Sequence, residues 1–346
     1  MNAPHRHFAS DNYSGACPEV TSAVALCNAG HAPSYGHDAW TASATHLLQQ
    51  IFEADCEVFL VHTGTAANAL ALATLCDGYH SVICHASAHI ETDECGAPGF
   101  FAPGSRLMPL AAPDGKLSPL LIDAAVGQRR DVHASKPRAV SLTQATELGT
   151  VYRVEEFAAL AAAARGHGLY LHVDGARFAN AVAALQLPPR RLTVDIGVDV
   201  LCFGGTKNGM MSGEAIVFFN RELARDFDYR RKQAGQLCSK MRFLAAQWIG
   251  VLEGEVWLRN ARHANGMARI LAERLMAVPS ARLVYPCEAN AVFVDLPAAV
   301  RAGLQQRGWQ FYTDVGPDGA ARLMCSWDTQ ESDIDALIAD IESLSK

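Results

Sequence analysis

Three short polar segments of the chain each follow an apolar run that we expect to form a β-strand. The first is HTGT at residues 62–65, the second is HVDGAR at residues 172–177, and the third is GGTK at residues 204–207. In open α/β sheets, ligand-binding and catalytic residues come directly after the carboxyl ends of the strands. Each segment is therefore a candidate part of a functional site.

The first segment has the properties of a phosphate-binding turn. Gly64 lets the backbone approach a ligand closely, and a threonine such as Thr65 can give its hydroxyl to an anion. The helix that follows would add free N–H groups and the positive end of its dipole. A plain helix cap is the alternative interpretation of the same residues.

The second and third segments each place a charged side chain at the end of an apolar strand. Asp174 is costly there unless it is paired, either with a cationic ring nitrogen of a ligand or with Arg177. Lys207 leaves its strand through two glycines, and partial burial would lower its pKa and make it a nucleophilic amine. The alternatives are a structural ion pair for Asp174 and an exposed loop position for Lys207.

Together the three segments match what pyridoxal phosphate (PLP) requires of a protein. A lysine forms the Schiff base, and an aspartate keeps the pyridine nitrogen protonated, so that the ring accepts electrons. Thr65, Asp174 and Lys207 follow three candidate strands of one sheet. Their combination is a more specific signal than any of the three alone.

Most of the chain resembles the low-specificity L-threonine aldolases. The resemblance runs through Ser10-Asp11, YGHD at 35–38, HTGTAANALAL, HVDGARFANA, FGGTKNG and ARLMCSWDT. It implies the aspartate-aminotransferase-like fold of PLP enzymes, fold type I. We therefore expect an α/β protein with a large PLP-binding domain around a mostly parallel mixed sheet and a smaller C-terminal α+β domain.

The resemblance also implies roles for residues around the cofactor. Lys207 matches the lysine that carries PLP, and Asp174 matches the partner of the pyridine nitrogen. His89, in the segment AHIETDE, matches the histidine that stacks on the cofactor ring. The phosphate contacts of the family match Gly64, Thr65 and Thr206.

Further matches concern the substrate. The residues that bind the substrate carboxylate match Ser10, Arg177 and Arg322, and Arg177 is also expected beside the cofactor. His133, in DVHASKP, is similar to a second histidine near the substrate hydroxyl. Tyr35 falls in a Tyr-Gly-x-Asp stretch that the family places near the active site, of the same or a neighbouring subunit.

Two stretches depart from the family pattern. Where many members have Glu-Asn-Thr-His, this chain has TQATE at residues 143–147, so the contacts of that stretch do not transfer. A glycine-rich stretch whose arginine reaches a neighbouring subunit's phosphate appears here as QAGQLCSKMRF at residues 233–243. Lys240 or Arg242 is the candidate substitute for that arginine.

The expected reaction is retro-aldol cleavage of a β-hydroxy-α-amino acid, namely L-threonine, L-allo-threonine or a relative such as phenylserine, to glycine and an aldehyde. A histidine titrates in the range that suits the base, so His89, His133 or a water held by either is the candidate. The alternatives are an aminotransferase or another β-hydroxy amino acid lyase, because fold alone does not determine reaction type. More remote ones are a non-catalytic regulatory protein and a metal-dependent hydrolase, whose ligands would come from His85, His89, Asp93, Glu94 and His172.

Composition excludes several other classes of protein. The 346 residues are 50% hydrophobic and 19% charged, which is typical of a globular chain of about two domains. A net charge of −7 gives no broad footprint for nucleic acid. Ten cysteines without a Cys-x-x-Cys pair indicate buried reduced thiols.

Neither a secretory signal nor an apolar run of the ~20 residues needed for a membrane helix is present, so we expect a cytoplasmic protein. The family resemblance suggests a homotetramer built from dimers.

The expected elements alternate between strand and helix as far as residue 240. Strands are predicted at 57–61, 81–84, 138–142, 169–173, 199–203 and 215–219, with helices at 41–53, 66–76 and 155–165. This segment forms the predicted large domain, residues 1–240. Residues 241–346 form the small one, with helices at 241–276 (broken near 250–254), 298–306 and 332–344, the last capped by Ser332. Its predicted strands are 282–285, 291–295, 309–312 and 322–326.

Overall fold

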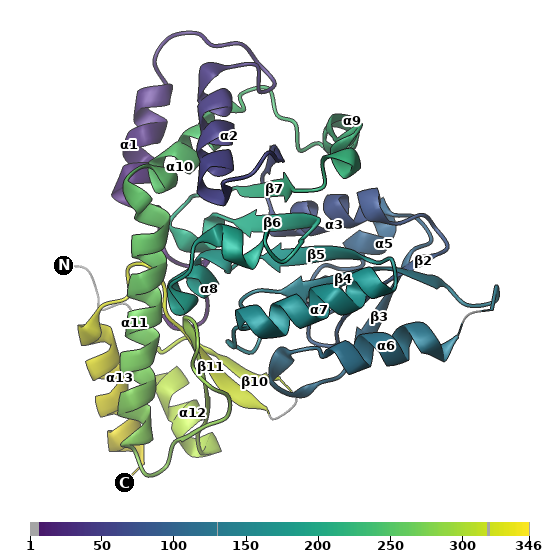
Figure 1. Cartoon of the computed structure of the whole chain (residues 1–346). Helices are drawn as coiled ribbons and strands as arrows, with labels where there is room; N and C mark the ends of the chain where they lie inside the picture. The colour runs from purple at the N-terminus through teal and green to yellow at the C-terminus, as the bar shows by residue number, and fades with distance from the viewer. Residues whose placement is uncertain (1–6, 130, 317–318, 346) are drawn as a thin grey trace.

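The structure is a computed structural model that describes residues 7–129, 131–316 and 319–345. Residues 1–6 of the predicted large domain lie outside the described residues. A seven-stranded sheet forms the centre of the larger part (Figure 1). Its strands are β1 (Glu57–Val61), β2 (His80–His85), β3 (Arg106–Leu110), β4 (Lys136–Thr143), β5 (Tyr170–Gly175), β6 (Val200–Gly204) and β7 (Glu214–Phe218).

The strand order of this sheet is β1-β7-β6-β5-β4-β2-β3. Strand β7 is antiparallel to both of its neighbours, β1 and β6, while the pairs from β6 to β3 are parallel. The other six strands therefore end at one edge of the sheet. At this edge Thr143 pairs with Asp174, and Asp174 pairs with Cys202 on the next strand. The fold confirms the expected mostly parallel mixed sheet.

Both faces of the large sheet are buried, as its nearly continuous apolar strands predict. Alternate residues point to opposite faces, so Val200 and Cys202 belong to one core while Leu201 and Phe203 belong to the other. Helices α3 (Gly64–Leu75) and α5 (Ala97–Phe101) lie behind the sheet in Figure 1. Helices α6 (Pro119–Gln128), α7 (Val154–Gly166) and α8 (Phe178–Leu185) lie in front of it.

The smaller part contains a four-stranded antiparallel sheet in the order β10-β11-β9-β8. Its strands are β8 (Arg282–Leu283), β9 (Ala291–Asp295), β10 (Tyr312–Val315) and β11 (Ala320–Met324). Helices α11 (Val256–Met276), α12 (Ala298–Gln306) and α13 (Glu331–Leu344) pack on it. The remaining helices are α1 (Pro18–Cys27), α2 (Ala39–Phe52), α4 (His89–Thr92), α9 (Phe227–Gln233) and α10 (Arg242–Leu252).

The long helix α11 belongs to both parts of the molecule. Leu258 and Ala261 in its first half pack in the core of the large sheet, whereas Ala268 and Leu271 pack in the core of the small one. Helix α10 also packs in the large core. The predicted boundary between residues 240 and 241 thus precedes two helices that contact the large sheet, and the division into two domains there stays a prediction.

Several local predictions differ from the structure. Gln330, not Ser332, precedes α13 as its N-cap, and its side chain and that of Asp333 form a capping box. The predicted strand 309–312 begins only at Tyr312, as β10, because residues 307–308 form the turn after α12 and Gln310 makes only an isolated bridge with His7. The break near 250–254 is confirmed, since a turn at Glu253–Glu255 separates α10 from α11.

All ten cysteines are free, as expected, but not all are buried. Seven are buried, Cys238 and Cys287 are half-buried, and Cys95 is exposed. Within the part of the chain that the structure describes, no helix combines the length and apolar character needed to cross a lipid bilayer.

Candidate active site

Lys207 lies in a buried turn at the end of β6. The backbone passes from β6 to Lys207 through Gly204 and Gly205. A Cβ on Gly204 would lie 2.5 Å from the Ala176 carbonyl oxygen, and a Cβ on Gly205 would lie 2.2 Å from Met210 Sδ. Only glycines allow this close packing, and it directs the following turn, Thr206–Asn208, back into the molecule. Burial, and then the charge of Arg177, lower the pKa of Lys207. Lys207 is therefore an amine suited to nucleophilic attack.

Asp174 points from β5 toward α3 and is held there by two hydrogen bonds. Asn68 Nδ2 donates to Oδ2 at 2.8 Å, and the backbone N–H of Ala176 donates to Oδ1 at 3.0 Å. No Arg177–Asp174 hydrogen bond is among those of the described residues, because Arg177 pairs instead with Asp11. The strand-end carboxylate is thus available to a cationic partner within the cavity.

Asn68 connects Asp174 to a second buried carboxylate. The same Nδ2 donates to Oε1 of Glu94 at 2.8 Å, and this oxygen also contacts His89 Nδ1 at 2.9 Å. The hydrogen bond to Glu94 raises the pKa of His89, and burial raises the pKa of Glu94. The His89–Glu94 pair therefore retains a proton more strongly than either group would alone.

The HTGT turn begins helix α3. Thr63 caps the helix by accepting a hydrogen bond from the backbone N–H of Ala66 at 3.2 Å, so Gly64 and Thr65 occupy the first helical turn. Gly64 faces a small cavity of about 60 Å³ that Asp174 and Lys207 also line. The positive end of α3 is thus directed at this cavity.

Thr206, predicted to contact the phosphate, is already bound within the protein. Its hydroxyl donates to Glu214 Oε1 at 2.8 Å and accepts from the backbone N–H of Gly213 at 2.9 Å. Burial raises the pKa of Glu214 to about 7. Thr206 therefore fixes the turn before Lys207, whatever contact it makes with a ligand.

The predicted carboxylate-binding residues meet in a larger cavity of about 710 Å³ beside the small one. Ser10, Arg177 and Arg322 all line it, although they come from three distant segments of the chain. Arg177 is oriented by a bidentate ion pair with Asp11, at 2.7 and 2.8 Å. Arg322 donates through Nη2 to the carbonyl of Ala9, while its buried Nε has no partner among the described residues.

Residues not predicted for the site also line these cavities or support it. Asn68, Glu94 and Glu147 are examples, and Glu147 belongs to both cavities. The sequence signal for Asn68 is its polar side chain within the alanine- and leucine-rich segment that forms helix α3. Glu94 follows His89 by five residues, but no local pattern shows that it turns back to the imidazole.

Two predicted residues do not join the site within this chain. His133 is exposed, and it precedes β4 at the amino end of that strand, opposite the edge where Asp174 and Lys207 lie. Within this chain strand β4 separates His133 from the cavities, and its place near the substrate stays a prediction. Tyr35 is exposed and rests against Lys232, whose Nζ lies 4.4 Å from the ring centre.

The departing stretch at 233–243 lies next to the start of α3. Gln236 Oε1 accepts from the backbone N–H of His62, while Lys240 is exposed and Arg242 Nη1 donates to the carbonyl of Gly30. The stretch is near the HTGT turn in this chain. Which residue replaces the family's arginine stays a prediction.

The histidines considered as metal ligands make other contacts. His85 places its ring nitrogens on Ser87 Oγ and the Ala112 carbonyl, and His172 contacts Ser141 Oγ and Cys202 Sγ. Burial lowers the pKa of His172 to about 4. Among the described residues, no three His, Cys, Asp or Glu side chains gather as a metal site would require.

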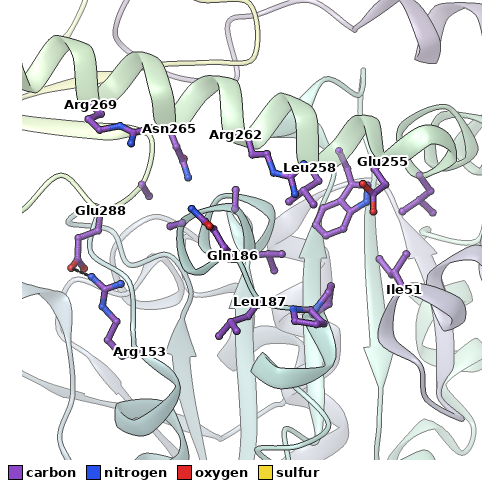
Figure 2. Close-up of a pocket in the computed structure, with 18 of the residues that line it drawn as sticks. Ile51, Arg153, Gln186, Leu187, Glu255, Leu258, Arg262, Asn265, Arg269 and Glu288 are labelled. Carbon is purple, nitrogen blue, oxygen red and sulfur yellow. Dashed lines mark hydrogen bonds and ion pairs between the residues drawn. The ribbon is translucent and has the colours of Figure 1, made fainter.

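A more voluminous hollow, of about 1020 Å³, lies apart from these residues. It runs between α8 and α11 and is lined by Leu258 and Arg262, with an Arg153–Glu288 ion pair at one end (Figure 2). None of the residues predicted for the site faces it. Chemistry, rather than volume, therefore distinguishes the candidate active site.

The donor set around Lys207 fits PLP. A buried amine, a buried carboxylate with an oxygen facing the same cavity, and a helix N-terminus suit an aldehyde, a ring nitrogen and a phosphate, respectively. His89 lines the same small cavity, as a ring-stacking residue must.

Comparison with known proteins agrees with this assignment. Residues 7–299 match the beta-eliminating lyase family. The chain is 57% identical over 336 residues to a low specificity L-threonine aldolase of Pseudomonas aeruginosa, covering 97% of each chain. It is 54% identical to that of a Pseudomonas sp., covering 99% of each. The solved structure of Leishmania major threonine aldolase superimposes with a TM-score of 0.92 at 30% identity, covering 98% of this chain and 99% of the other. The chain therefore belongs to the beta-eliminating lyase family and, within it, to the low-specificity L-threonine aldolases.

Proposed function

We propose that the chain uses PLP to cleave L-threonine, L-allo-threonine and related β-hydroxy-α-amino acids such as phenylserine to glycine and an aldehyde. The observation that carries this proposal is the meeting of Lys207, Asp174 and the start of α3 around one cavity, next to a second cavity lined by two arginines. The first group suits the cofactor, and the second suits an amino acid carboxylate.

Lys207, Asp174 and Gly64 would hold the cofactor. Lys207 would supply the amine for the Schiff base, and Asp174 would keep the ring nitrogen protonated. The cofactor would supply an acceptor for the electron pair that remains at the substrate α-carbon when a bond to it breaks. His89, oriented by Glu94, would pack on the ring.

Arg177 and Arg322 would hold the substrate carboxylate with Ser10. Arginine suits this role because its planar fork can make two parallel hydrogen bonds to a carboxylate. Asp11 holds Arg177 in one orientation, which limits how the substrate can rotate about its α-carbon. This clamp would select the Cα–Cβ bond for cleavage.

The central test replaces the amine. Lys207→Ala is expected to abolish the visible absorption of bound PLP after dialysis and to abolish aldehyde release from L-threonine. Lys136→Ala, at an exposed position at the start of β4, is the control and is expected to keep both. Undiminished aldehyde release by Lys207→Ala would refute the proposal.

Substrate tests separate the alternatives. Aldehyde released from L-threonine, L-allo-threonine and phenylserine, each measured separately, gives the stereochemical and size preference. An aminotransferase would instead convert bound PLP to its amine form with a simple amino acid, and an aldolase would not. A homotetramer and a cytoplasmic location belong to the same proposal, and light scattering tests the first of these.

A further inference from the structure

Four side chains line both cavities of the site. They are His89, Glu147, Arg177 and Lys207. The small cavity contains the residues proposed for the cofactor, and the larger one contains those proposed for the substrate carboxylate. A group at the junction of the two faces the place where substrate bonds must change.

Two of the four can exchange a proton near neutral pH. Lys207 is assigned to the cofactor, and Arg177 stays charged and is paired with Asp11. His89 is bound through Nδ1 to Glu94, which raises the pKa of His89, so that the ring stays protonated to higher pH and cannot then accept a further proton. Glu147 remains as the acceptor.

Glu147 is held in one position with one oxygen unused. Its Oε1 accepts hydrogen bonds from Thr143 Oγ1 at 2.8 Å and from the backbone N–H of His89 at 2.9 Å. Its Oε2 is buried and has no hydrogen-bond partner among the described residues. A buried acceptor without a donor costs free energy, so such an atom calls for a functional explanation.

The loop that carries Glu147 is itself well ordered by hydrogen bonds. Thr146 and Thr150 pair through both backbone and side chains, and Gln144 bonds to the backbone of Tyr152. The carboxylate lies in the stretch where this chain departs from the Glu-Asn-Thr-His of many family members.

We propose that Glu147 is the catalytic group that accepts the β-hydroxyl proton of the substrate, an inference that rests on the proposed function. The O–H bond breaks, and its proton passes to the Glu147 carboxylate. The electron pair of that bond becomes the second bond of the aldehyde C=O. The Cα–Cβ pair stays on the α-carbon, which later takes up one proton to give glycine, so that atoms and charge balance.

The surroundings of Glu147 suit this role at neutral pH. Burial and then the negative charge of Asp174 raise the pKa of Glu147 to about 7. The charged or titratable groups that line the small cavity with it are Asp174 from β5, His89 from α4, Glu94 after α4, Arg177 before α8 and Lys207 after β6. The Cys84 thiol and the Tyr152 hydroxyl also interact electrostatically with it. A base must be deprotonated, so kcat is expected to fall as the pH drops below this pKa.

The test uses Glu147→Gln in the PLP-loaded enzyme, with two reactions measured. We expect kcat for L-threonine cleavage to fall by about 10²-fold or more, with loss of the acid limb of its pH profile. Exchange of the glycine α-proton in heavy water, followed by NMR, needs no β-hydroxyl base and is expected to change little. The visible absorption of bound PLP should also be unchanged.

Other outcomes have distinct meanings. If Glu147→Gln cleaved L-threonine as fast as the parent enzyme, the catalytic role of Glu147 would be overturned. If the variant lost glycine exchange and PLP absorption as well as cleavage, the role would also be overturned, because Glu147 would then be structural. A parent enzyme that exchanges glycine protons but releases no aldehyde would instead refute the proposed function. Glu155→Gln, the same change at an exposed position of α7, is the matched control and should behave as the parent.

Discussion

One buried neighbour is the main cause of the raised pKa of His89. Glu94 accepts a hydrogen bond from Asn68 of α3 and also bonds to His89 Nδ1, so that one carboxylate contacts both the helix α3 and the imidazole. Asn68 bonds to Asp174 with the same amide group. The groups proposed to contact the cofactor ring and its nitrogen are therefore connected through a single side chain.

Replacing Glu94 by glutamine should lower the pKa of His89. The amide can still bond to the ring but carries no charge, so the main cause of the raised pKa is removed. An NMR titration of the His89 ring is expected to show its pKa moving toward the usual value of about 6.5 or below. The control is Glu91→Gln, at an exposed position of α4, the helix that carries His89, and it should leave the pKa of His89 unchanged. An unaltered titration of His89 in the Glu94 variant would contradict this account.

At the scale of elements, the edge of the sheet brings the site together. Strands β1, β5 and β6 end at the same edge because only β7 among the seven strands is reversed. The loop after β4 adds Glu147 to this edge. That loop packs on the small sheet, since a Cβ at Gly149 would lie 3.2 Å from the carbonyl oxygen of Ala291.

Gly149→Ala tests the rigidity of this loop. Gly149 has a φ of 78°, which alanine adopts only with strain, and the added methyl group would press on Ala291. The free energy of unfolding in urea is expected to fall by about 1–3 kcal/mol. Gly127→Ala in α6 meets no atom within 4 Å and should not destabilise the protein. Equal stability of the two variants would show that the loop tolerates the change.

At the scale of the whole molecule, the N-terminal segment joins the two sheets. Phe8 bonds to the backbone of Gln310 and Met324 and packs in the small core. Three residues later, Asp11 is buried and bonds to Arg177 at the end of the large sheet and to Asn290. The larger cavity is therefore lined by residues from both ends of the chain, among them Ser10 and Arg322.

Asp11→Asn is expected to weaken the folded state. Burial tends to raise the pKa of Asp11, but the charge and hydrogen bonds of Arg177 outweigh it, and the pKa is lowered. The substitution leaves Arg177 buried without its partner, at a cost of about 3 kcal/mol in the free energy of unfolding. Urea unfolding at neutral pH measures this cost. Glu222→Gln, which breaks an exposed ion pair with Arg225, is the control and should have no measurable effect.

The pH dependence of the same variant gives an independent check. A carboxyl whose pKa is lower in the folded than in the unfolded state stabilises the protein above the unfolded value, near 3.8, and loses that contribution as the pH falls through the folded value. The stability difference between parent and Asp11→Asn should thus shrink in acid. A difference that stays constant down to that range would assign the loss to packing alone.

Much of the architecture follows from local sequence. The apolar runs at 57–61 and 291–295 are strands with those same bounds, because length, β-branched residues and flanking turns specify them locally. Lys207 and Asp174 could be chosen in advance for the same reason. Each ends a buried strand, where a charged side chain without a ligand or partner is costly.

Contacts between distant segments could be decided only by tertiary structure. Strand alternation tells which face a residue points to, but not which loop from elsewhere meets it. The pairing of Asp11 with Arg177, the turn of Glu94 toward His89 and the placement of Glu147 all depend on such meetings. The position of His133 is a further example, since only the direction of β4 shows that it lies at the opposite edge within this chain. The sequence by itself thus determined which charged residues follow the strand ends, and long-range packing decided which side chains surround them.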